Sequence, residues 1–376
     1  MSVDPRPRIL SGVQPSGKLH LGNYFGAIQQ HIALQDQGEA FYFIADYHAL
    51  TTLQAVTRQY STLGAIAERH EAKKQTTGGS APVSVVSRRT AREILEDNVR
   101  DVALDYLALG LDPAKATFYR QSDVPEVNEL AWFLATLTGM GLLERAHSYK
   151  DKTARGLEAN VGLFTYPILM AADILIVRSH LVPVGKDQVQ HLEMTRDMAG
   201  YFNNTYGEVF PMPAERLGVA AVVPGTDGQK MSKSYGNTID IFADKNAVKV
   251  AVQKVVTDST PVTEPKNPDS CNVFALYKLF ASEEEQCKLA DLYRTPMLEA
   301  DSRQGKPFGF GNAKQILQDA IVKYFAPARE RRKALERDPG RVEEVLRAGA
   351  KKAREVARTT LRLVRQRVGM LPESVG

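Results

Sequence analysis

The chain has 376 residues, 43% of them hydrophobic and 24% charged, which is enough apolar material for about two or three domains. A formal net charge of +4 permits a nucleic-acid partner without requiring one. The two cysteines form no Cys-x-x-Cys pair, so we expect no structural zinc and a reducing, cytoplasmic setting. The N-terminal residues lack a signal-peptide pattern, and the longest apolar run, 161–177, is short for a membrane span. We therefore expect a soluble protein without a membrane segment.

The first informative stretch is residues 9–30. A short apolar strand leads into a turn rich in Gly, Ser and Pro, and then into a helical pattern. Backbone N–H groups and the helix dipole at such a helix start favour an anion. Gly22 would let a ligand approach bare backbone, and His20 and Asn23 would project to one side of the first turn. The same letters also suit a plain glycine turn with a capping Asn, so this stretch alone leaves both interpretations open.

A second apolar strand is predicted at 41–45, with a helix at 24–37 between the two strands. This order is typical of the opening of a doubly wound parallel sheet. His48 stands just beyond the carboxyl end of the second strand, where such sheets bind their ligands. Residues 71–89 are polar and rich in Gly, Ser and Thr at their centre, and we expect a long surface loop there.

Regular patterns return after this loop. An amphipathic helix is predicted at 90–109, a short strand at 117–120, a helical stretch at 126–149 and a strand at 181–184. The alternation of strands and helices favours an extension of the same parallel sheet.

One charged residue stands within the apolar run at 161–177. Tyr166, Met170 and Asp173 fall on a single face of the helix predicted there. A buried carboxylate without a partner is unfavourable, so Asp173 indicates either a structural salt bridge or a group that binds a ligand.

Residues 230–234 read Lys-Met-Ser-Lys-Ser and follow an apolar strand predicted at 219–223. Two lysines and two hydroxyls without a competing carboxylate suit a mobile clamp for a triphosphate, although a lone cluster of this kind is more often a solvated loop. Beyond it the sequence is helical and charged. The basic residues of the last helix indicate either a solvated face or a contact with RNA phosphate; they are Arg347, Lys351, Lys352, Arg354, Arg358, Arg362, Arg365 and Arg367.

The letters Pro-Ser-Gly-Lys-Leu-His-Leu-Gly-Asn at 15–23 and the lysine-serine loop at 230–234 resemble, in this order, the two signatures of class I aminoacyl-tRNA synthetases. Over most of its length the chain is similar to bacterial-type tryptophanyl-tRNA synthetases. The resemblance implies an α/β fold, with a doubly wound parallel, Rossmann-like nucleotide-binding domain at 1–242. An α-helical, tRNA anticodon-binding domain follows at 243–376. A bridging region at about 117–165 is implied to form a homodimer, and the loop at about 71–89 is an insertion relative to the family.

The reaction that the resemblance implies is attack of the carboxylate of L-tryptophan on the α-phosphate of ATP, with release of pyrophosphate. Transfer of tryptophan to the terminal adenosine of tRNA(Trp) follows. Both steps need positioning and charge neutralisation more than a protein nucleophile. ATP is then a substrate, and Mg²⁺ is expected to be bound mainly through its phosphates rather than at a protein metal site.

The resemblance assigns roles residue by residue. The implied catalytic residues are His20, Asn23, Lys152, Lys230 and Lys233. The implied ATP-binding residues are Gln14, Pro15, Ser16, Gly22, Asn23, Gly185, Lys186, Asp187, Val222, Lys230, Met231, Ser232, Lys233 and Ser234. The implied tryptophan-binding residues are Leu10, His48, Tyr166, Met170, Asp173 and Gln188, with Asp173 accepting the ring N–H. Lys186 departs from the acidic residue common in well-known relatives, and Leu10 replaces an aromatic residue found in some relatives.

Two alternatives stay open. A tyrosyl-tRNA synthetase would share the fold and the reaction but carries a Gln where this chain has Met170. A catalytically inactive, RNA-binding paralogue is a different class, and the two intact signature loops argue against it.

Overall fold

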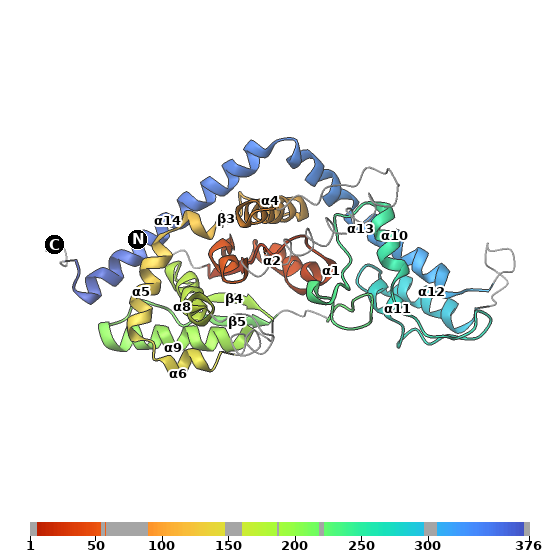
Figure 1. The fold of residues 1–376 in the computed structure, drawn as a ribbon, viewed down its shortest axis with the longest axis horizontal. Helices are drawn as coiled ribbons and strands as arrows, with labels where there is room; N and C mark the ends of the chain where they lie inside the picture. The colour runs from red at the N-terminus through yellow and green to blue at the C-terminus, as the bar shows by residue number, and fades with distance from the viewer. Residues whose placement is uncertain are drawn as a thin grey trace, which may run out of the picture.

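The structure is a computed structural model that describes residues 6–53, 57, 89–146, 160–185, 188–217, 222–296 and 307–371. Its centre is a parallel five-stranded sheet with the order β3-β2-β1-β4-β5 (Figure 1). The strands are β1 (Arg8–Val13), β2 (Glu39–Ile44), β3 (Ala116–Arg120), β4 (Leu181–Val184) and β5 (Ala214–Leu217). The α/β class and the parallel sheet predicted from the sequence are therefore confirmed. The loop predicted at 71–89 lies outside the described residues except for its last one.

Helices cover both faces of the sheet. Along β2, Ala40, Tyr42 and Ile44 face one hydrophobic cluster, and Phe41 and Phe43 face another. A strand buried on both sides in this way reads as a continuous apolar run. The first cluster contains α4 (Ala91–Leu109), and the second contains α5 (Glu126–Leu137), α6 (Met140–Glu144), α8 (Val161–Ile176) and α9 (Val189–Tyr206).

The helix that follows β1 is not the uniform helix predicted at 24–37. It starts as α1 (Leu21–Asn23), passes through a π-helical turn, η1 (Tyr24–Ile28), and ends as α2 (Gln29–Leu34). A π-helical turn inserts an extra residue, and such turns are frequent at functional sites. The insertion turns the residues before and after it to different directions around the helix axis.

The C-terminal part is helical: α10 (Lys245–Gln253), α11 (Asn272–Tyr277), α12 (Glu283–Arg294), α13 (Phe310–Glu336) and α14 (Pro339–Val368). Figure 1 shows α14 running back from this part across β3 to α5. A Cβ on Gly349 of α14 would lie 1.9 Å from the carbonyl oxygen of Phe118, so backbone meets backbone there. This helix covers the edge strand β3, which would otherwise offer unpaired backbone groups. The domain division at 242/243 stays a prediction.

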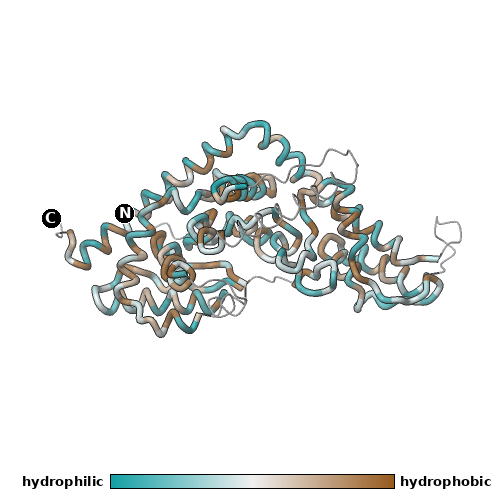
Figure 2. Tube along the Cα trace, in the orientation of Figure 1, coloured by the Kyte–Doolittle hydropathy of each residue, from teal (hydrophilic) through white to brown (hydrophobic). Residues whose placement is uncertain are grey.

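Two boundaries differ from the sequence-based ones. The strand before the lysine-serine loop is β5, which ends at Leu217; residues 218–221 lie outside the described part, and Val222 and Val223 belong to no strand. The helical stretch predicted at 126–149 is broken between α5 and α6. Figure 2 shows hydrophilic and hydrophobic positions alternating along α14, as expected of a helix with one packed face. Among the described helices, none combines the length and hydropathy needed to cross a membrane.

Candidate active site

A cavity of about 450 Å³ opens between β1 and β4. These neighbouring strands pair at a single register position, Ile9 with Leu181, and then separate. Pro183 has no backbone N–H to continue the ladder. The cavity is lined by Leu10, Ser11 and Gly12 of β1 and by Val182, Pro183 and Val184 of β4. Strand order reverses at this point of the sheet, since β2 and β3 lie on one side of β1 and β4 lies on the other. Open parallel sheets bind their ligands at such a switch point.

The structure gathers the predicted amino-acid pocket in this cavity. Its lining includes all six residues predicted to bind tryptophan, together with two of the predicted ATP-binding residues: Leu10, His48, Tyr166, Met170, Asp173 and Gln188, with Gln14 and Gly185. These residues come from β1, the end of β2, α8 and the end of β4, so the cavity unites segments that are far apart in the sequence.

Asp173 is the charged centre of the cavity and only 3% exposed. Its carboxylate contacts His48 Nε2 at 2.8 Å and accepts two hydrogen bonds from Gln121 Nε2, at 2.8 and 2.9 Å. Burial raises the pKa of Asp173, while the bonds from His48 and Gln121 act in the opposite direction. Asp173, which the sequence indicated would need a partner if buried, therefore has two partners, His48 and Gln121. Gln121 was missed, although its place directly after the strand at 117–120 is a signal that could have found it.

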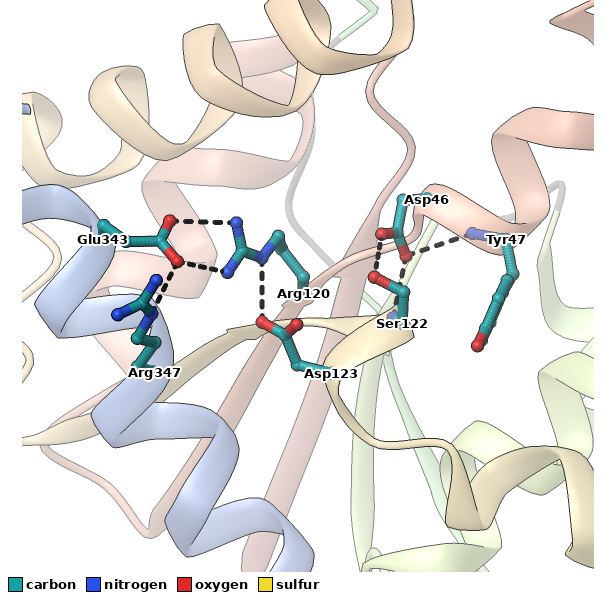
Figure 3. Close-up of polar contacts among 7 residues, drawn as sticks. All are labelled: Asp46, Tyr47, Arg120, Ser122, Asp123, Glu343 and Arg347. Carbon is teal, nitrogen blue, oxygen red and sulfur yellow. Dashed lines mark hydrogen bonds and ion pairs between the residues drawn. The ribbon is translucent and has the colours of Figure 1, made fainter. Parts of the chain in front are cut away.

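The turn at 121–123, which follows β3, is held by polar contacts on two sides (Figure 3). On one side, Asp46 accepts hydrogen bonds from the backbone N–H of Ser122 at 2.9 Å and from the Ser122 hydroxyl. On the other side, Arg120 forms a bidentate ion pair with Glu343 of α14, at 2.7 and 2.9 Å, and also contacts Asp123. These contacts hold the turn that presents Gln121 to Asp173.

His20 and Asn23 lie at the start of α1. The backbone N–H of His20 donates to Asn23 Oδ1 at 3.1 Å, so Asn23 does cap the helix start. Burial, and secondarily the charge of Lys233, lower the pKa of His20 to about 4. A Cβ on Gly22 would lie 3.0 Å from the His20 ring and 3.3 Å from Met231 Cβ, so packing also favours a glycine there. The side chain of Met231 is buried in the core, and the predicted contact of this residue with ATP stays a prediction.

The lysine-serine loop is docked on the turn at 15–17. Lys233 Nζ donates to the carbonyl oxygens of Ser16 and Gly17, both at 3.0 Å, and contacts the Ser16 hydroxyl at 3.3 Å. Desolvation of the ammonium lowers its pKa to about 8. The hydroxyls of Ser232 and Ser234 form a hydrogen bond of 2.9 Å. The two signature stretches are therefore in direct contact, and Gln14, close by in the chain, also lines the amino-acid cavity.

Asn237 shapes the same loop and was not predicted. Its Oδ1 accepts from the backbone N–H of Ser232 at 2.8 Å, and its Nδ2 donates to the carbonyl oxygen of Lys230 at 3.1 Å. Its side chain is buried, 2% exposed, so it fixes the loop from beneath. A single Asn a few residues beyond the loop carries no pattern that would reveal this role.

Some predicted residues are not brought into the cavity. The side chain of Val222 is 70% exposed and does not line it, and the adenine contact of Val222 stays a prediction. Lys152, Lys186 and Asp187 lie outside the described residues.

The comparisons with known proteins agree with this geometry. The family model of class I tRNA synthetases (W and Y) matches residues 2–85 and 78–326. The tryptophan–tRNA ligase of Fusobacterium nucleatum is 48% identical over 97% of this chain and 98% of its own length, and that of Rhodopirellula baltica is 46% identical over 96% and 99%. A crystal structure of tryptophanyl-tRNA synthetase from Campylobacter jejuni, complexed with ADP and tryptophan, superposes with a TM-score of 0.80 at 43% identity, covering 96% of this chain and 99% of that one. The chain therefore belongs to the class I tRNA synthetases for tryptophan and tyrosine, among the tryptophanyl-tRNA synthetases.

Proposed function

We infer that this chain is a tryptophan–tRNA ligase. It activates L-tryptophan with ATP, releases pyrophosphate, and transfers the tryptophan to the terminal adenosine of tRNA(Trp) in the cytoplasm. Relatives named for this activity match it over nearly their full length. The observation that carries the inference at the site is the pairing of Asp173 with Met170 in an apolar cavity beside the two signature loops.

The cavity suits an indole. The ring has one N–H donor on a large apolar body, so it needs one acceptor and otherwise apolar walls. Asp173 is the acceptor, and Met170, which is soft and unbranched, packs along the ring. Tyr166 and Gln188 take the ammonium group, while His48 and Leu10 border the pocket. The hydroxyl of Tyr166 is itself in contact with His191 Nε2, which fixes its direction.

The phosphates of ATP belong at the contact between the two loops. A phosphate oxygen competes with the carbonyl oxygens of Ser16 and Gly17 for the ammonium of Lys233, and the ion pair is the stronger of the two. Lys230, Ser232 and Ser234 extend this grip to the leaving pyrophosphate, and Lys152 supplies a further charge. His20, Gly22 and Asn23 face the adenosine and the α-phosphate, Gln14 and Pro15 line the entrance, and Gly185, Lys186 and Asp187 receive the ribose. Mg²⁺ would be held mainly by the phosphate oxygens of ATP, because this ion keeps several waters and needs few protein ligands.

The choice of tryptophan over tyrosine rests on residue 170. A phenol hydroxyl both donates and accepts, so it calls for a second polar group beside Asp173. Met170 offers none. The tyrosine alternative therefore lacks a polar partner at position 170, and the inactive paralogue is disfavoured because both signature loops retain their lysines, hydroxyls and mutual contact.

We propose that the enzyme is a homodimer joined through the region around α5, α6 and the start of α8. Trp132, Met140 and Val161 are 68%, 62% and 78% exposed, an unusual set of large apolar side chains on neighbouring elements. Burial against a second copy would remove them from water, and a two-fold interface pairs the same patch with itself.

The helical segment 243–376 is proposed to bind the anticodon, but much of the basic face of α14 serves the fold. Arg354 and Arg358 pair with Glu126 of α5, and Arg365 pairs with Glu129. For these three arginines the ion pairs within the chain favour a role in the fold over a contact with RNA phosphate.

The test of the proposed function is ATP–pyrophosphate exchange by the purified protein with each of the twenty amino acids in turn. Exchange that depends on tryptophan supports it. Exchange with tyrosine instead, or with no amino acid, would reject it.

A further inference from the structure

A chain of buried polar side chains leads from the core to the cavity. Ser11 of β1 lines the cavity, and its Oγ lies 2.9 Å from Nε2 of His31 on α2. Nδ1 of the same ring lies 3.1 Å from the hydroxyl of Tyr106 on α4. The three residues are 7%, 5% and 1% exposed. None of them has a role in the function proposed above, and a fully buried polar chain calls for a purpose.

The imidazole in the middle of this chain is held in one orientation. The ring of Tyr42 stacks on that of His31, with centroids 5.7 Å apart and 13° between the planes. The Tyr42 hydroxyl donates to the backbone carbonyl of His31 at 2.6 Å. The stacked ring of Tyr42 thus holds the imidazole of His31 with its two nitrogens toward Ser11 and Tyr106, while the Tyr42 hydroxyl contacts only the backbone.

The direction of the hydrogen bonds follows from what each group can donate. Burial lowers the pKa of His31 to about 4, so the ring is neutral, with one N–H and one acceptor nitrogen. Within the described residues His31 is the hydrogen-bond partner of the Tyr106 hydroxyl, and this buried O–H must donate to it. Nδ1 is then the acceptor, and the proton on Nε2 is donated to Ser11 Oγ.

In this arrangement neither His31 nor Tyr106 accepts a hydrogen bond from the hydroxyl of Ser11. Ser11 Oγ accepts from His31, so its own O–H is available on the side of the cavity that Ser11 lines. The opposite tautomer would let Ser11 donate to His31, but it would strand the proton of Tyr106 in the core without an acceptor, which is costly.

We propose that Ser11 is a substrate-binding residue whose hydroxyl donates to an acceptor oxygen of the bound reactants, and that Tyr106 and His31 are positioning residues that aim this proton into the cavity. The oxygen belongs either to the α-carboxylate of the amino acid or to the nucleotide. The proposal rests on the proposed function, since it assigns a new residue to the same site.

Two substitutions test it by different routes. Ser11→Ala removes the donor. Tyr106→Phe leaves Ser11 and His31 in place but removes the hydroxyl that donates to Nδ1 of His31. The imidazole can then carry its proton on Nδ1 and accept the hydroxyl proton of Ser11 on Nε2, so that this proton no longer points into the cavity. Both should raise the KM of the same substrate in ATP–pyrophosphate exchange by about tenfold to a hundredfold, the scale of a lost hydrogen bond to a charged oxygen. Whether the KM of tryptophan or that of ATP rises identifies the oxygen.

The double variant distinguishes a relay from two separate defects. If Tyr106 acts through Ser11, Ser11→Ala combined with Tyr106→Phe should lose no more than Ser11→Ala alone. Tyr42→Phe is the matched control, because it keeps the ring that stacks on His31 and deletes only a buried hydroxyl that bonds to the backbone carbonyl of His31. It should lower the melting temperature without changing either KM.

The result that overturns the proposal is an active parent protein whose two KM values are unchanged by Ser11→Ala, or a double variant whose losses add. A parent protein without tryptophan-dependent exchange would instead reject the proposed function, so the two failures are distinguishable.

Discussion

The ammonium of Lys233 lies 3.0 Å from the carbonyl oxygen of Ser16, which joins the two signature loops directly. The same ammonium also donates to the carbonyl of Gly17. Neutral carbonyls are weaker acceptors than phosphate oxygens, so the lysine can exchange them for the growing charge of a leaving pyrophosphate. The contact thus holds the cation close to where the proposed reaction would use it.

Lys233→Ala should slow formation of the adenylate by about 10²–10³-fold, the scale of losing one preorganised charge contact in the transition state. The affinity for tryptophan should be unchanged, because Lys233 is not among the residues that line the amino-acid cavity. Pre-steady-state rates of activation measure the first effect, and equilibrium binding measures the second. Lys249→Ala, which removes an exposed lysine of α10, is the matched control and should leave both at the parent values. An unaltered activation rate in the first variant would remove Lys233 from the mechanism.

Stability should fall in mild acid because of His31. Its folded-state pKa of about 4 lies below the ordinary 6.5, so the unfolded chain takes up a proton first as the pH falls. The stability is fully present above pH 6.5 and is lost progressively toward pH 4. Between pH 7 and pH 5 the loss from this group is about 2 kcal/mol. Denaturant unfolding of the parent and of His31→Phe at both pH values checks this. The unfolding free energy of His31→Phe should fall less between pH 7 and pH 5 than that of the parent, although His20 keeps a contribution of the same sign. Equal losses in the two proteins would contradict the role given to His31.

Gly349 should be intolerant of any side chain. Its Cβ would lie 1.9 Å from the carbonyl oxygen of Phe118, so Gly349→Ala must push α14 away from β3. We expect a loss of about 3 kcal/mol in the free energy of unfolding, toward the upper end for overpacking. Gly311→Ala is the matched control, because a Cβ on this helical glycine meets nothing within 4 Å. The control should be neutral or slightly stabilising. Equal melting temperatures for the two variants would show that α14 is not fixed on the strand.

The dimer prediction can be tested at the only tryptophan of the chain, Trp132. Light scattering at micromolar protein should give the mass of two chains. Trp132→Lys should shift this to one chain, because a charge at the centre of an apolar interface lacks a partner, and aromatic anchors often contribute about 2 kcal/mol or more. Val250→Lys, which replaces an exposed apolar residue of α10, should leave the mass unchanged. A single-chain mass for the parent protein would contradict the proposed assembly.

The sequence predicted those parts of the site that follow from periodicity and from the edge of a parallel sheet. Tyr166, Met170 and Asp173 share a helix face because of the 3.6-residue repeat, and His48 follows a strand end. These four side chains do line one cavity.

What the sequence could not predict depends on contacts between distant elements. The place of Gln121 after a strand does not reveal its partner, because the bond to Asp173 joins the end of β3 to α8. His31 reads as one more buried position of a helix until Ser11 and Tyr106 are seen on either side. The ion pair of Arg120 with Glu343 joins residues 223 positions apart, through a helix whose return to the sheet leaves no local pattern. Pairing of this kind is decided by tertiary packing rather than by propensity.

The last prediction concerns the amino acid that is chosen. A site built to bond one polar group rejects analogues that lack it by up to about 10⁴–10⁵-fold. Asp173→Ala should therefore reduce kcat/KM for tryptophan severely while ATP binding persists. The same change also leaves Gln121 and His48 without their shared acceptor, so its melting temperature must be measured beside its activity.

Met170→Gln is the cleaner variant, because it leaves the contacts of Asp173 intact and places an amide against the indole. The unmatched amide should weaken tryptophan binding, while a phenol hydroxyl would gain a partner, so the ratio of tryptophan to tyrosine activation should fall. Exchange with both amino acids, for the parent and for Met170→Gln, gives this ratio directly. If the parent activates tyrosine faster than tryptophan, the pairing of Met170 with Asp173 does not select the indole, and the protein is a tyrosyl-tRNA synthetase instead.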